Sequence, residues 1–452
     1  MKPAVVILAA GKGKRMYSAR PKVLHRLADK PLVAHVVDKA LTLKPEAIYM
    51  VYGHGGEQVR QALATLPIHW VQQTQQLGTG HAVAQAVPHI DDNTWVLVLL
   101  GDVPLIEAAT LERLCQSVVP HSIGLLTVTL ADAQGYGRIV RNAQGQVERI
   151  VEERDADTTI KAIKEINTGI LIAQAQDLRR WLAALTADNA QGEYYLTDII
   201  ERAVAEHFEI RTTTPNAVAE VMGVNDQRQL AELERYYQQQ QVQQLLLNGV
   251  NVRDPARLDI RGQVQAGREV TIDVNVILEG QVTLGDRVSI GPYCLIRDAH
   301  IADDVQIFSH CVLESVSVAA HCRIGPFARL RPETQLAEHV HIGNFVEIKK
   351  SAVAQHSKIN HLSYIGDTTV GQAVNIGAGT ITCNYDGVHK HQTSIGDRAF
   401  IGSDTQLVAP VTVGAGATIG AGSTITQDAP ADTLTLSRVP QQSVPGWQPK
   451  KK

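Results

Sequence analysis

The fold of the C-terminal half is decided by residues 318–348, VAAHCRIGPFARLRPETQLAEHVHIGNFVEI, where the sequence repeats every six residues. The aliphatic positions of the repeat are Val318, Ile324, Leu330, Leu336, Ile342 and Ile348. A period of six fits neither a helix stripe nor one face of a long strand. It requires a short strand and a corner in each repeat, with the aliphatic side chain inward and glycine easing the corner. The repeat predicts a parallel β-helix whose stacked coils share one apolar column.

The same register extends outward in both directions, from residue 272 to residue 425. Occasional steps of five are small corrections, but the gap between residues 376 and 395 is larger. We expect Cys383 to Gln392 to loop out of the column there. Such an excursion is a typical place for functional residues.

Upstream of the repeat, a segment rich in Gln, Glu, Leu and Arg predicts a linker helix over 226–249. Asn225 or Asp226 is the candidate N-cap, and Gly249 is the candidate residue after the C-cap. A disordered polar tract over 238–244 is the alternative. Because Gln is a fair helix former and leucines bracket the tract, we favour the helix.

The first half alternates short apolar runs with longer amphipathic stretches. The runs cover residues 4–8, 48–52, 95–100 and 123–128, and strands that are apolar at every position suit a sheet covered on both faces. This predicts an α/β Rossmann-like domain with a mostly parallel sheet. The expected organisation is therefore a domain over 1–225, a linker helix over 226–249 and a β-helix over 250–452.

Composition narrows the class of ligand. The 452 residues carry a formal net charge of -4 with both signs mixed, so nothing suggests binding to nucleic acid or to a membrane. The five cysteines form no CxxC pair and favour reduced thiols. The apolar start is short and leads into a basic, glycine-containing stretch, so we expect a cytoplasmic chain without a secretory signal. Small molecules are the expected ligands.

A phosphate-binding loop is predicted directly after the first strand. Gly11 and Gly13 let the backbone approach a phosphate, and Lys22 follows nearby. Asp102 ends another apolar strand, where a carboxylate is well placed for Mg²⁺. The alternatives are an ordinary tight turn at the glycines and an aspartate that caps the turn before Pro104.

A second chemical site is predicted on the β-helix, around His361. A single histidine is more often a surface group than a catalyst, but charged and polar residues accompany His361 on the predicted coils. Arg331, Lys349 and Lys390 supply cations, and Tyr364, Asn375 and Asn384 offer hydrogen bonds. A neutral imidazole accepts a proton when an amine attacks a thioester, so no nucleophilic side chain is needed. We interpret Cys383 as a packing residue.

The motifs carry a family resemblance. The first half resembles the sugar-1-phosphate nucleotidyltransferases in three motifs: LxxGxGxRM over 8–16, Pro21-Lys22 and Leu100-Gly101-Asp102. Further motifs are similar to those of the branch of this family that acts on N-acetylglucosamine 1-phosphate. They are Gln73, 76–80, 135–138, Glu152, 165–169, 192–195 and 223–225. The whole chain resembles the bifunctional N-acetylglucosamine-1-phosphate uridylyltransferase / glucosamine-1-phosphate acetyltransferase family. Leu100 departs from it, because members often carry an aromatic residue there.

The resemblance implies the roles of individual residues in the first half. Gln73, Gly78 and Thr79 hold uracil; Gly137, Glu152 and Asn167 hold the sugar; Asp102 and Asn225 bind Mg²⁺. The substrate-binding set that it implies is Leu8, Ala9, Ala10, Gly11, Arg15, Lys22, Gln73, Gly78, Thr79, Leu100, Gly101, Asp102, Gly137, Glu152, Asn167 and Asn225. The expected substrates are UTP and N-acetylglucosamine 1-phosphate.

For the second half, the resemblance implies His361 as general base. It places Arg331, Lys349, Tyr364 and Asn375 around glucosamine 1-phosphate, and it assigns acetyl-CoA to Ala378, Asn384, Tyr385, Ser403, Ala421 and Arg438. It also implies left-handed coils and a homotrimer, which the period of six does not show. The two reactions would together yield UDP-N-acetylglucosamine for cell-wall and lipid glycans.

Two other classes stay open. One is a β-helical zinc hydratase of the γ-carbonic anhydrase type, suggested by His310, His321, His339, His341, His356 and His361, although their spacing shows no local ligand motif. The other is a nucleotidyltransferase-like regulatory subunit whose β-helix serves only assembly. Asp102, Asn225 and His361 argue against the regulatory subunit.

Overall fold

A computed structural model describes residues 2–11, 13–53 and 55–449, and it divides into two compact units, Met1–Tyr237 and Gln238–Lys452. The boundary between these units falls inside helix α8 (Gln227–Leu247). No helix of the described part is long and apolar enough to cross a membrane. Each unit has its own apolar core.

The N-terminal unit is built on one sheet whose strand order is β11-β7-β10-β6-β1-β4-β5. The strands of this unit are β1 (Ala4–Ala9), β2 (Arg26–Leu27), β3 (Lys30–Pro31), β4 (Ala47–Tyr52), β5 (His69–Gln72), β6 (Trp95–Leu100), β7 (Ser122–Thr129), β8 (Arg138–Arg141), β9 (Val147–Val151), β10 (Glu165–Gln174) and β11 (Glu209–Thr213). Strands β1, β4, β5 and β6 are parallel, as predicted. Strand β10 runs antiparallel between β6 and β7, which the short apolar runs did not reveal.

Helices cover both faces of this sheet. They are α1 (Leu32–Thr42), α2 (Gly56–Ala62), α3 (Thr79–Ala86), α4 (Ala108–Ser117), α5 (Thr158–Lys161), α6 (Ala175–Ala183) and α7 (Asp198–Ala205). One core packs α1, α2 and α4 against the sheet, and a second packs α3, α6 and α7 against the opposite face. The strands are consequently buried on both faces, which explains their continuous apolar runs.

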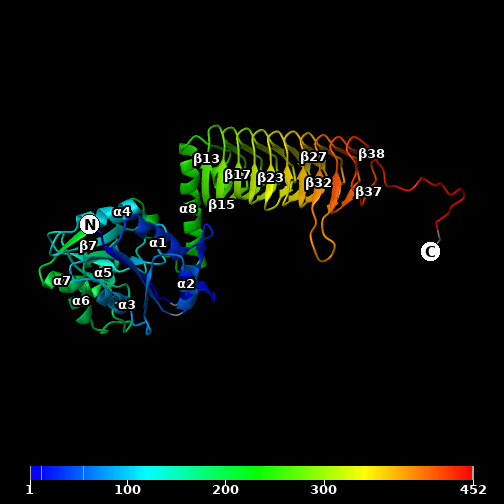
Figure 1. Cartoon of the computed structure of the whole chain (residues 1–452). Helices are drawn as coiled ribbons and strands as arrows, with labels where there is room; N and C mark the ends of the chain where they lie inside the picture. Colours follow the sequence, from blue (N-terminus) through cyan, green and yellow to red (C-terminus); the bar gives the residue numbers. More distant parts are fainter. Residues whose placement is uncertain (1, 12, 54, 450–452) are drawn as a thin grey trace. The chain divides into compact units, whose positions relative to one another are not determined.

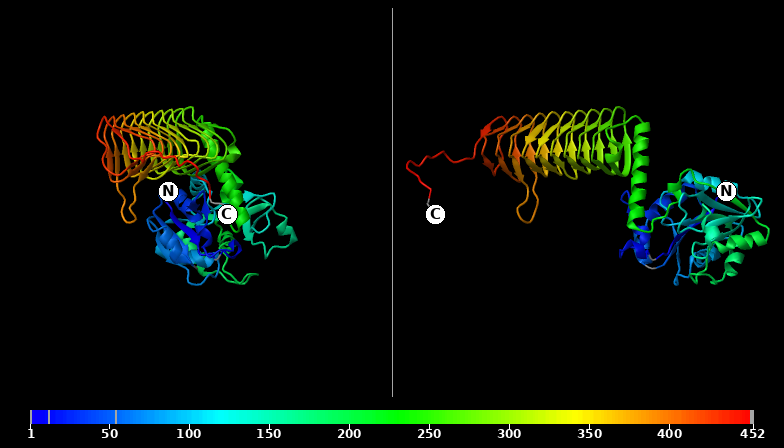
Figure 2. Two further views of the ribbon diagram at one scale, coloured as in Figure 1. Left: turned by 90° about the vertical axis from the view of Figure 1, so that its right-hand side faces the viewer. Right: turned by 180° about the vertical axis from the view of Figure 1, so that it is seen from behind.

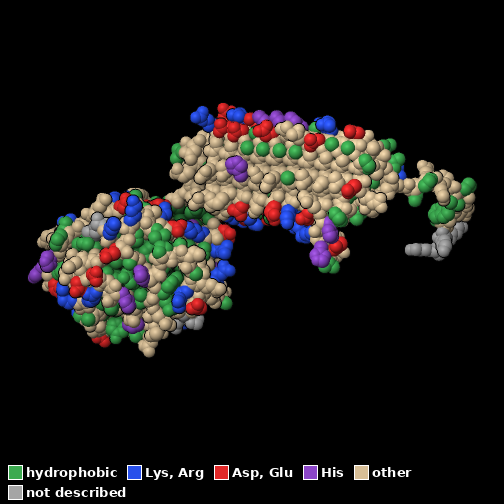
Figure 3. Space-filling model, in the orientation of Figure 1, with side chains coloured by type: hydrophobic (Ala, Val, Ile, Leu, Met, Phe, Trp, Pro, Cys, Tyr) green, Lys and Arg blue, Asp and Glu red, His purple; other side chains and the backbone are tan. Residues whose placement is uncertain are grey.

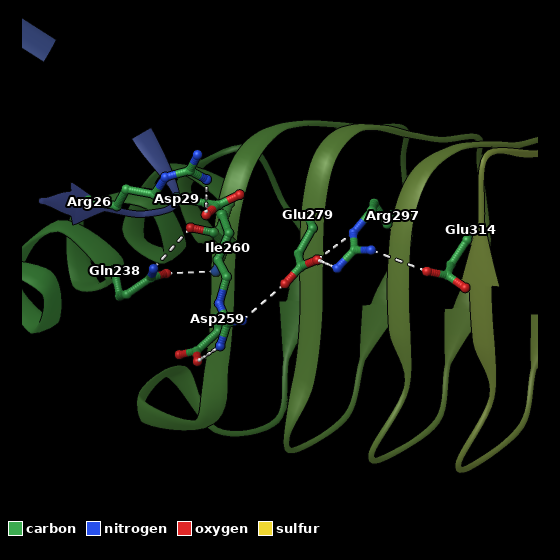
Figure 4. Close-up of polar contacts among 9 residues, drawn as sticks. Arg26, Asp29, Gln238, Asp259, Ile260, Glu279, Arg297 and Glu314 are labelled. Atoms are coloured by element: carbon green, nitrogen blue, oxygen red, sulfur yellow. Dashed lines mark hydrogen bonds and ion pairs between the residues drawn. The ribbon is translucent and has the colours of Figure 1, made fainter. Parts of the chain in front are cut away.

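Helix α8 begins and ends at residues that the sequence indicated. Asp226 caps it, because its Oδ1 accepts a hydrogen bond from the backbone N–H of Gln229 at 2.8 Å. Gly249 follows its end with a φ of 87°, a conformation that favours glycine. The glutamine tract is helical, and Gln238 is buried with its side chain bonded to the backbone N–H and C=O of Ile260 (Figure 4). Those two bonds fix the tract on the first coil.

The C-terminal unit is a parallel β-helix with three strands in a coil (Figures 1 and 2). Its first face consists of β12 (Asn251–Val252), β14 (Thr271–Ile272), β16 (Ser289–Ile290), β18 (Gln306–Ile307), β21 (Arg323–Ile324), β24 (His341–Asn344), β27 (Lys358–His361), β30 (Asn375–Ile376), β33 (Phe400–Ile401), β36 (Thr418–Ile419) and β38 (Leu434–Thr435). The long strands β13 (Leu258–Ala266), β15 (Val276–Leu284) and β17 (Leu295–Ile301) bend across the other two faces.

Shorter strands continue those two faces. The second face continues with β19 (Val312–Glu314), β22 (Arg329–Leu330), β25 (Glu347–Lys349), β28 (Tyr364–Gly366), β31 (Ile381–Cys383), β34 (Gln406–Val408) and β37 (Thr424–Ile425). The third continues with β20 (Val316–Val318), β23 (Thr334–Leu336), β26 (Ala352–Val353), β29 (Thr368–Val370), β32 (Thr393–Ile395) and β35 (Val411–Val413). Aliphatic residues of the six-residue repeat point inward from all three faces and form one buried column.

The predicted excursion is present between β31 and β32. A loop projects from the coils there (Figures 1 and 3), and Tyr385 and Lys390 pair across it. Asp386 ties the loop together by accepting hydrogen bonds from the backbone N–H groups of Val388 and His389. The loop begins on the second face, one coil beyond Tyr364.

Exposed ion pairs join successive coils on the second face. Figure 4 shows Arg297 between Glu279 and Glu314, with N···O distances of 2.6 Å and 3.1 Å. Exposed pairs of this kind each stabilise a fold by about 0–1 kcal/mol, so the apolar column carries most of the stability. The pattern continues to Arg331 and Glu347.

Candidate functional sites

The first site lies where β1 and β6 end side by side. Leu8 is in register with Leu100, and the N–H of Gly101 donates to the carbonyl of Leu8 at 2.9 Å. Carboxyl ends of parallel strands meet at one edge of the sheet, so the glycine loop and Asp102 are brought together. The N–H of Val224 donates to the backbone carbonyl of Asp102 at 2.9 Å. This bond places Asn225 beside the aspartate.

Two basic side chains converge on Asp102 and Asn225. The Lys22 ammonium donates to Asp102 Oδ2 and, at 3.3 Å, to Asn225 Oδ1. The Arg15 guanidinium also donates to Asn225 Oδ1, at 3.1 Å. The Lys22 ammonium occupies a position from which one positive centre reaches both Asp102 Oδ2 and Asn225 Oδ1, as a bound metal ion would. A carboxylate and an amide oxygen with room for water and phosphate fit Mg²⁺.

Two cavities meet at this point. One, of about 550 Å³, is lined by the glycine loop together with Lys14, Lys22, Gln73 and Gln76. The other, of about 250 Å³, is lined by Gly137, Glu152, Asn167, Thr197 and Asn225, among others. Both cavities share the residues Leu8, Thr79, Leu100 and Asp102. The arrangement suits two reactants that meet beside Asp102.

The loop of residues 76–80 forms part of the wall of the first cavity. The N–H of Tyr194 donates to the carbonyl of Leu77, and the N–H of Gly80 donates to the carbonyl of Tyr194, both at 2.8 Å. A Cβ at Gly78 would lie 2.5 Å from the carbonyl oxygen of Tyr194, so only glycine fits. Gln73 is buried and donates to the carbonyl of Gly78 at 3.2 Å.

The second cavity contains a buried carboxyl group. Burial raises the pKa of Glu152, while a hydrogen bond from Thr197 opposes the shift. Thr197 Oγ1 donates to Glu152 Oε1 at 3.0 Å. The N–H of Asn167 donates to the carbonyl of Gly137 at 2.9 Å, which fixes the strand opposite. These groups can accept and donate hydrogen bonds to a polyhydroxylated ligand.

The second site lies on the corner that follows β27. Backbone bonds from one coil to the next place five residues in one row along this corner: Asn344, His361, Ala378, Ser403 and Ala421. His361 is exposed rather than directed into the apolar column. Its Nδ1 lies 2.8 Å from Asn344 Oδ1. Arg438 closes the row by donating to the carbonyl of Ala421 at 3.0 Å.

Cations gather beside the row, on the second face. The Lys390 ammonium, from the projecting loop, lowers the pKa of Lys349, with a smaller contribution from Arg331. Arg331 itself donates to Glu347 at 2.8 Å. A Cβ at Gly366 would lie 2.5 Å from the Tyr364 hydroxyl and 2.8 Å from the Asn384 amide nitrogen, so both groups lie over this glycine. The cluster can hold an anionic, hydroxylated ligand.

Three family models match this chain in sequence. A MobA-like NTP transferase domain matches residues 5–248, a GMPPB C-terminal domain matches residues 260–361, and the bacterial transferase hexapeptide (six repeats) matches residues 392–427. The chain is 57% identical to a bifunctional protein GlmU of Cupriavidus pinatubonensis, over 98% of each chain. It is 57% identical to that of Methylococcus capsulatus, over 99% of this chain and 97% of the relative, and 58% identical to that of Ralstonia nicotianae, over 98% of each chain.

The chain belongs to the GlmU family. The family and the pairing of a nucleotidyltransferase with a hexapeptide acyltransferase are therefore confirmed, as is the predicted fold class. The hexapeptide match is consistent with left-handed coils. As a member of the GlmU family, the chain is a bifunctional transferase, so its β-helix does more than serve assembly.

Most of the predicted site residues lie together in this GlmU family member. All of the nucleotidyltransferase set except Arg15 and Gly101 lines the two cavities, and Leu100 takes part in both. Arg15 instead contacts Asn225, and Gly101 bonds to the backbone of Leu8. On the β-helix, Asn375 is the exception, because it lies on the first face in register with Lys358 and Phe400 rather than on the corner. Tyr385 lies in the projecting loop, where its hydroxyl donates to the carbonyl of Gly387.

Sequence reasoning missed three residues that contact the predicted site residues. Asn344 stands 17 residues before His361, one coil away, and coil length was the only signal that could have found it. Thr197, which donates to Glu152, belongs to none of the motifs that the sequence indicated. Glu347, which binds Arg331, lies in register with Arg329 and Tyr364 of the neighbouring coils. Each of the three acts through a residue that the sequence did indicate.

The candidate histidines of the β-helix, all within the described part of the chain, do not gather into a metal-binding group. His321, His339 and His356 stack face to face at exposed positions along another corner, with ring centroids 4.7 Å and 4.8 Å apart. Parallel rings do not direct three nitrogens at one point, as tetrahedral zinc requires. Among the described residues, no group of three or more His, Cys, Asp or Glu could hold a metal ion. The structure thus favours the transferase over the hydratase.

Proposed function

We propose that this enzyme makes UDP-N-acetylglucosamine in two steps. The β-helix transfers an acetyl group from acetyl-CoA to glucosamine 1-phosphate, and the N-terminal unit then transfers UMP from UTP to N-acetylglucosamine 1-phosphate. The observation that carries the proposal is the convergence of Lys22 and Arg15 on Asp102 and Asn225, where two cavities meet. The functional domains that we propose are 1–225, the linker helix 226–249 and 250–452.

In the uridylyl transfer, an oxygen of the sugar phosphate attacks the α-phosphorus of UTP and pyrophosphate leaves. Lys22 and Arg15 neutralise phosphate charge, and the glycine loop lets the backbone approach the phosphates. Gln73, Gly78 and Thr79 form the wall for uracil, and Gly137, Glu152 and Asn167 face the sugar. Asp102 and Asn225 would hold Mg²⁺, which supplies charge neutralisation at the phosphates.

In the acetyl transfer, the amine of glucosamine 1-phosphate attacks the thioester carbonyl of acetyl-CoA. His361 removes the amine proton as the C–N bond forms, and the thiolate of coenzyme A leaves. Arg331, Lys349 and Lys390 bind the sugar phosphate, and Tyr364 and Asn375 are proposed to complete that site. Acetyl-CoA lies along Ala378, Ser403 and Ala421, with Asn384, Tyr385 and Arg438 around it.

Asn344 sets the tautomer of the proposed base. Its Oδ1 accepts only, so the ring nitrogen Nδ1 of His361 carries the hydrogen, and Nε2 keeps a free lone pair. We expect Asn344→Ala to lower kcat of acetyl transfer about tenfold, with little change in KM for glucosamine 1-phosphate, because the imidazole loses its orientation. Asn344→Asp keeps an acceptor oxygen and should retain more activity. Equal kcat values for wild type and Asn344→Ala would contradict this role.

A homotrimer is also proposed. One corner of the β-helix exposes an aromatic row, with Tyr293 52%, Phe327 46% and Phe345 54% exposed, and Leu362 beside His361 is 63% exposed. An apolar row of this length next to the candidate site favours cover by another copy. A sedimentation mass of three chains is expected, and a monomer would contradict it. We place the enzyme in the cytoplasm, with no nucleic acid or membrane as partner.

A coupled assay tests the whole proposal. With glucosamine 1-phosphate, acetyl-CoA, UTP and Mg²⁺, the enzyme should release coenzyme A and pyrophosphate in equal amounts. When acetyl-CoA is omitted, pyrophosphate release should fall sharply, and N-acetylglucosamine 1-phosphate should restore it. Unchanged release without acetyl-CoA would show that acetylation does not precede uridylyl transfer.

A further inference from the structure

The candidate metal ligands are already engaged by basic side chains from the loop after β1. Lys22, in the short helix η2 (Lys22–Leu24), reaches both Asp102 Oδ2 and Asn225 Oδ1. Arg15, in η1 (Lys14–Met16), reaches the same amide oxygen at 3.1 Å. Both oxygens therefore have cationic partners from the protein itself.

The charge balance opposes a free divalent cation at this place. Among the described residues, the hydrogen-bonded group at this centre consists of one carboxylate, one neutral amide and two cations. The side chains of Lys22 and Asp102 are only 15% and 17% exposed, so solvent and salt screen their interaction weakly. A second cation that approaches Asp102 has to displace Lys22 or face its charge a few ångströms away.

A nucleoside triphosphate would change this balance. Lys22 and Lys14 both line the cavity of about 550 Å³ next to Asp102, together with the glycine loop. The flexible stem of Lys22 lets its ammonium turn from the carboxylate towards phosphate oxygens without moving the backbone. Once Lys22 and Arg15 face phosphate, Asp102 Oδ2 and Asn225 Oδ1 become available to a metal ion.

We propose that Lys22 and Arg15 keep divalent cations off Asp102 and Asn225 until a nucleoside triphosphate draws the two basic side chains away. This inference rests on the proposed uridylyltransferase function. Metal binding and nucleotide binding are then mutually dependent, and each strengthens the other by the same factor. The protein by itself holds the metal weakly, and the metal site forms when the nucleotide arrives.

The test measures binding of Mn²⁺ alone to the full chain, by the electron paramagnetic resonance signal of free Mn²⁺. We expect Lys22→Met to bind Mn²⁺ at least about tenfold more tightly than wild type, because a nearby positive charge is lost. Lys22→Arg keeps the charge and should bind as weakly as wild type. The matched control is Lys39→Met, since Lys39 pairs with Glu107 at 2.7 Å at a more exposed position.

Further measurements locate the effect. Adding Asp102→Asn to Lys22→Met should remove the increase in Mn²⁺ affinity that Lys22→Met produces. A non-hydrolysable UTP analogue should tighten Mn²⁺ binding more in wild type than in Lys22→Met. Equal Mn²⁺ affinity of wild type and a folded Lys22→Met would overturn the inference. If wild type fails to transfer uridylyl groups, the proposed function fails instead, whatever the Mn²⁺ affinities are.

Discussion

His361→Ala should abolish acetyl transfer while uridylyl transfer from N-acetylglucosamine 1-phosphate continues at the wild-type rate. The imidazole is exposed on the corner of the β-helix, and its Nδ1 is held by Asn344 at 2.8 Å. Loss of a general base lowers a rate by about 10²- to 10⁴-fold. Coenzyme A release, followed with a thiol reagent, measures the first reaction, and pyrophosphate release measures the second.

His356→Ala is the matched control for this substitution. His356 is also an exposed histidine of the β-helix, but it stacks on His339 along a different corner. We expect it to leave both activities unchanged. Loss of both activities in His361→Ala would count against separate sites, and full acetyl transfer in that variant would remove His361 as the base.

The repeat was readable from sequence because its physical cause recurs in every coil. Ile324, Ile342 and Ile359 are each fully buried, in register on neighbouring strands of one face. A position that must be apolar in each turn leaves a period in the sequence. The row of Asn344, His361 and Ala378, in which only His361 is exposed, leaves none, because its residues differ from coil to coil.

The N-terminal unit shows a different limit of sequence reasoning. Apolar runs identified β1, β4, β6 and β7, but β10 was recognised only as a motif around Asn167 and not as an antiparallel strand of the sheet. Strand direction depends on partners far away in the sequence, and a run of apolar residues does not record it. Glu152 and Asn167 face the same cavity only through this arrangement.

Helix α8 also changes how the chain should be divided. From the predicted domain bounds 1–225 and 226–249, a cut near residue 230 would be expected to isolate uridylyl transfer. In the structure such a cut falls within α8 and removes Leu233, which is buried in a small core with Met16 and Leu32. It also removes Glu234, whose carboxylate accepts from the backbone N–H of Ala28 at 2.7 Å. A piece that extends to Gly249 keeps these contacts.

Asp102→Ala should have the complementary effect and abolish uridylyl transfer while acetyl transfer continues. Asp102 Oδ2 binds the Lys22 ammonium at the junction of the two cavities, and Asp102 is the carboxylate that we propose for Mg²⁺. Removing it leaves Lys22 without its negative partner and removes a metal ligand. We expect kcat/KM for UTP to fall at least about 100-fold, measured as pyrophosphate release with N-acetylglucosamine 1-phosphate.

Two further variants separate charge from shape. Asp102→Asn keeps an oxygen at the same place but removes the charge, so it should be nearly as inactive as Asp102→Ala if the carboxylate holds a cation during transfer. Asp38→Ala removes a carboxylate that pairs with Lys30 at an exposed position, and it should leave pyrophosphate release unchanged. Full pyrophosphate release by Asp102→Ala would refute the metal assignment. The opposite losses in His361→Ala and Asp102→Ala, each with the other reaction intact, are what two independent sites on one chain require.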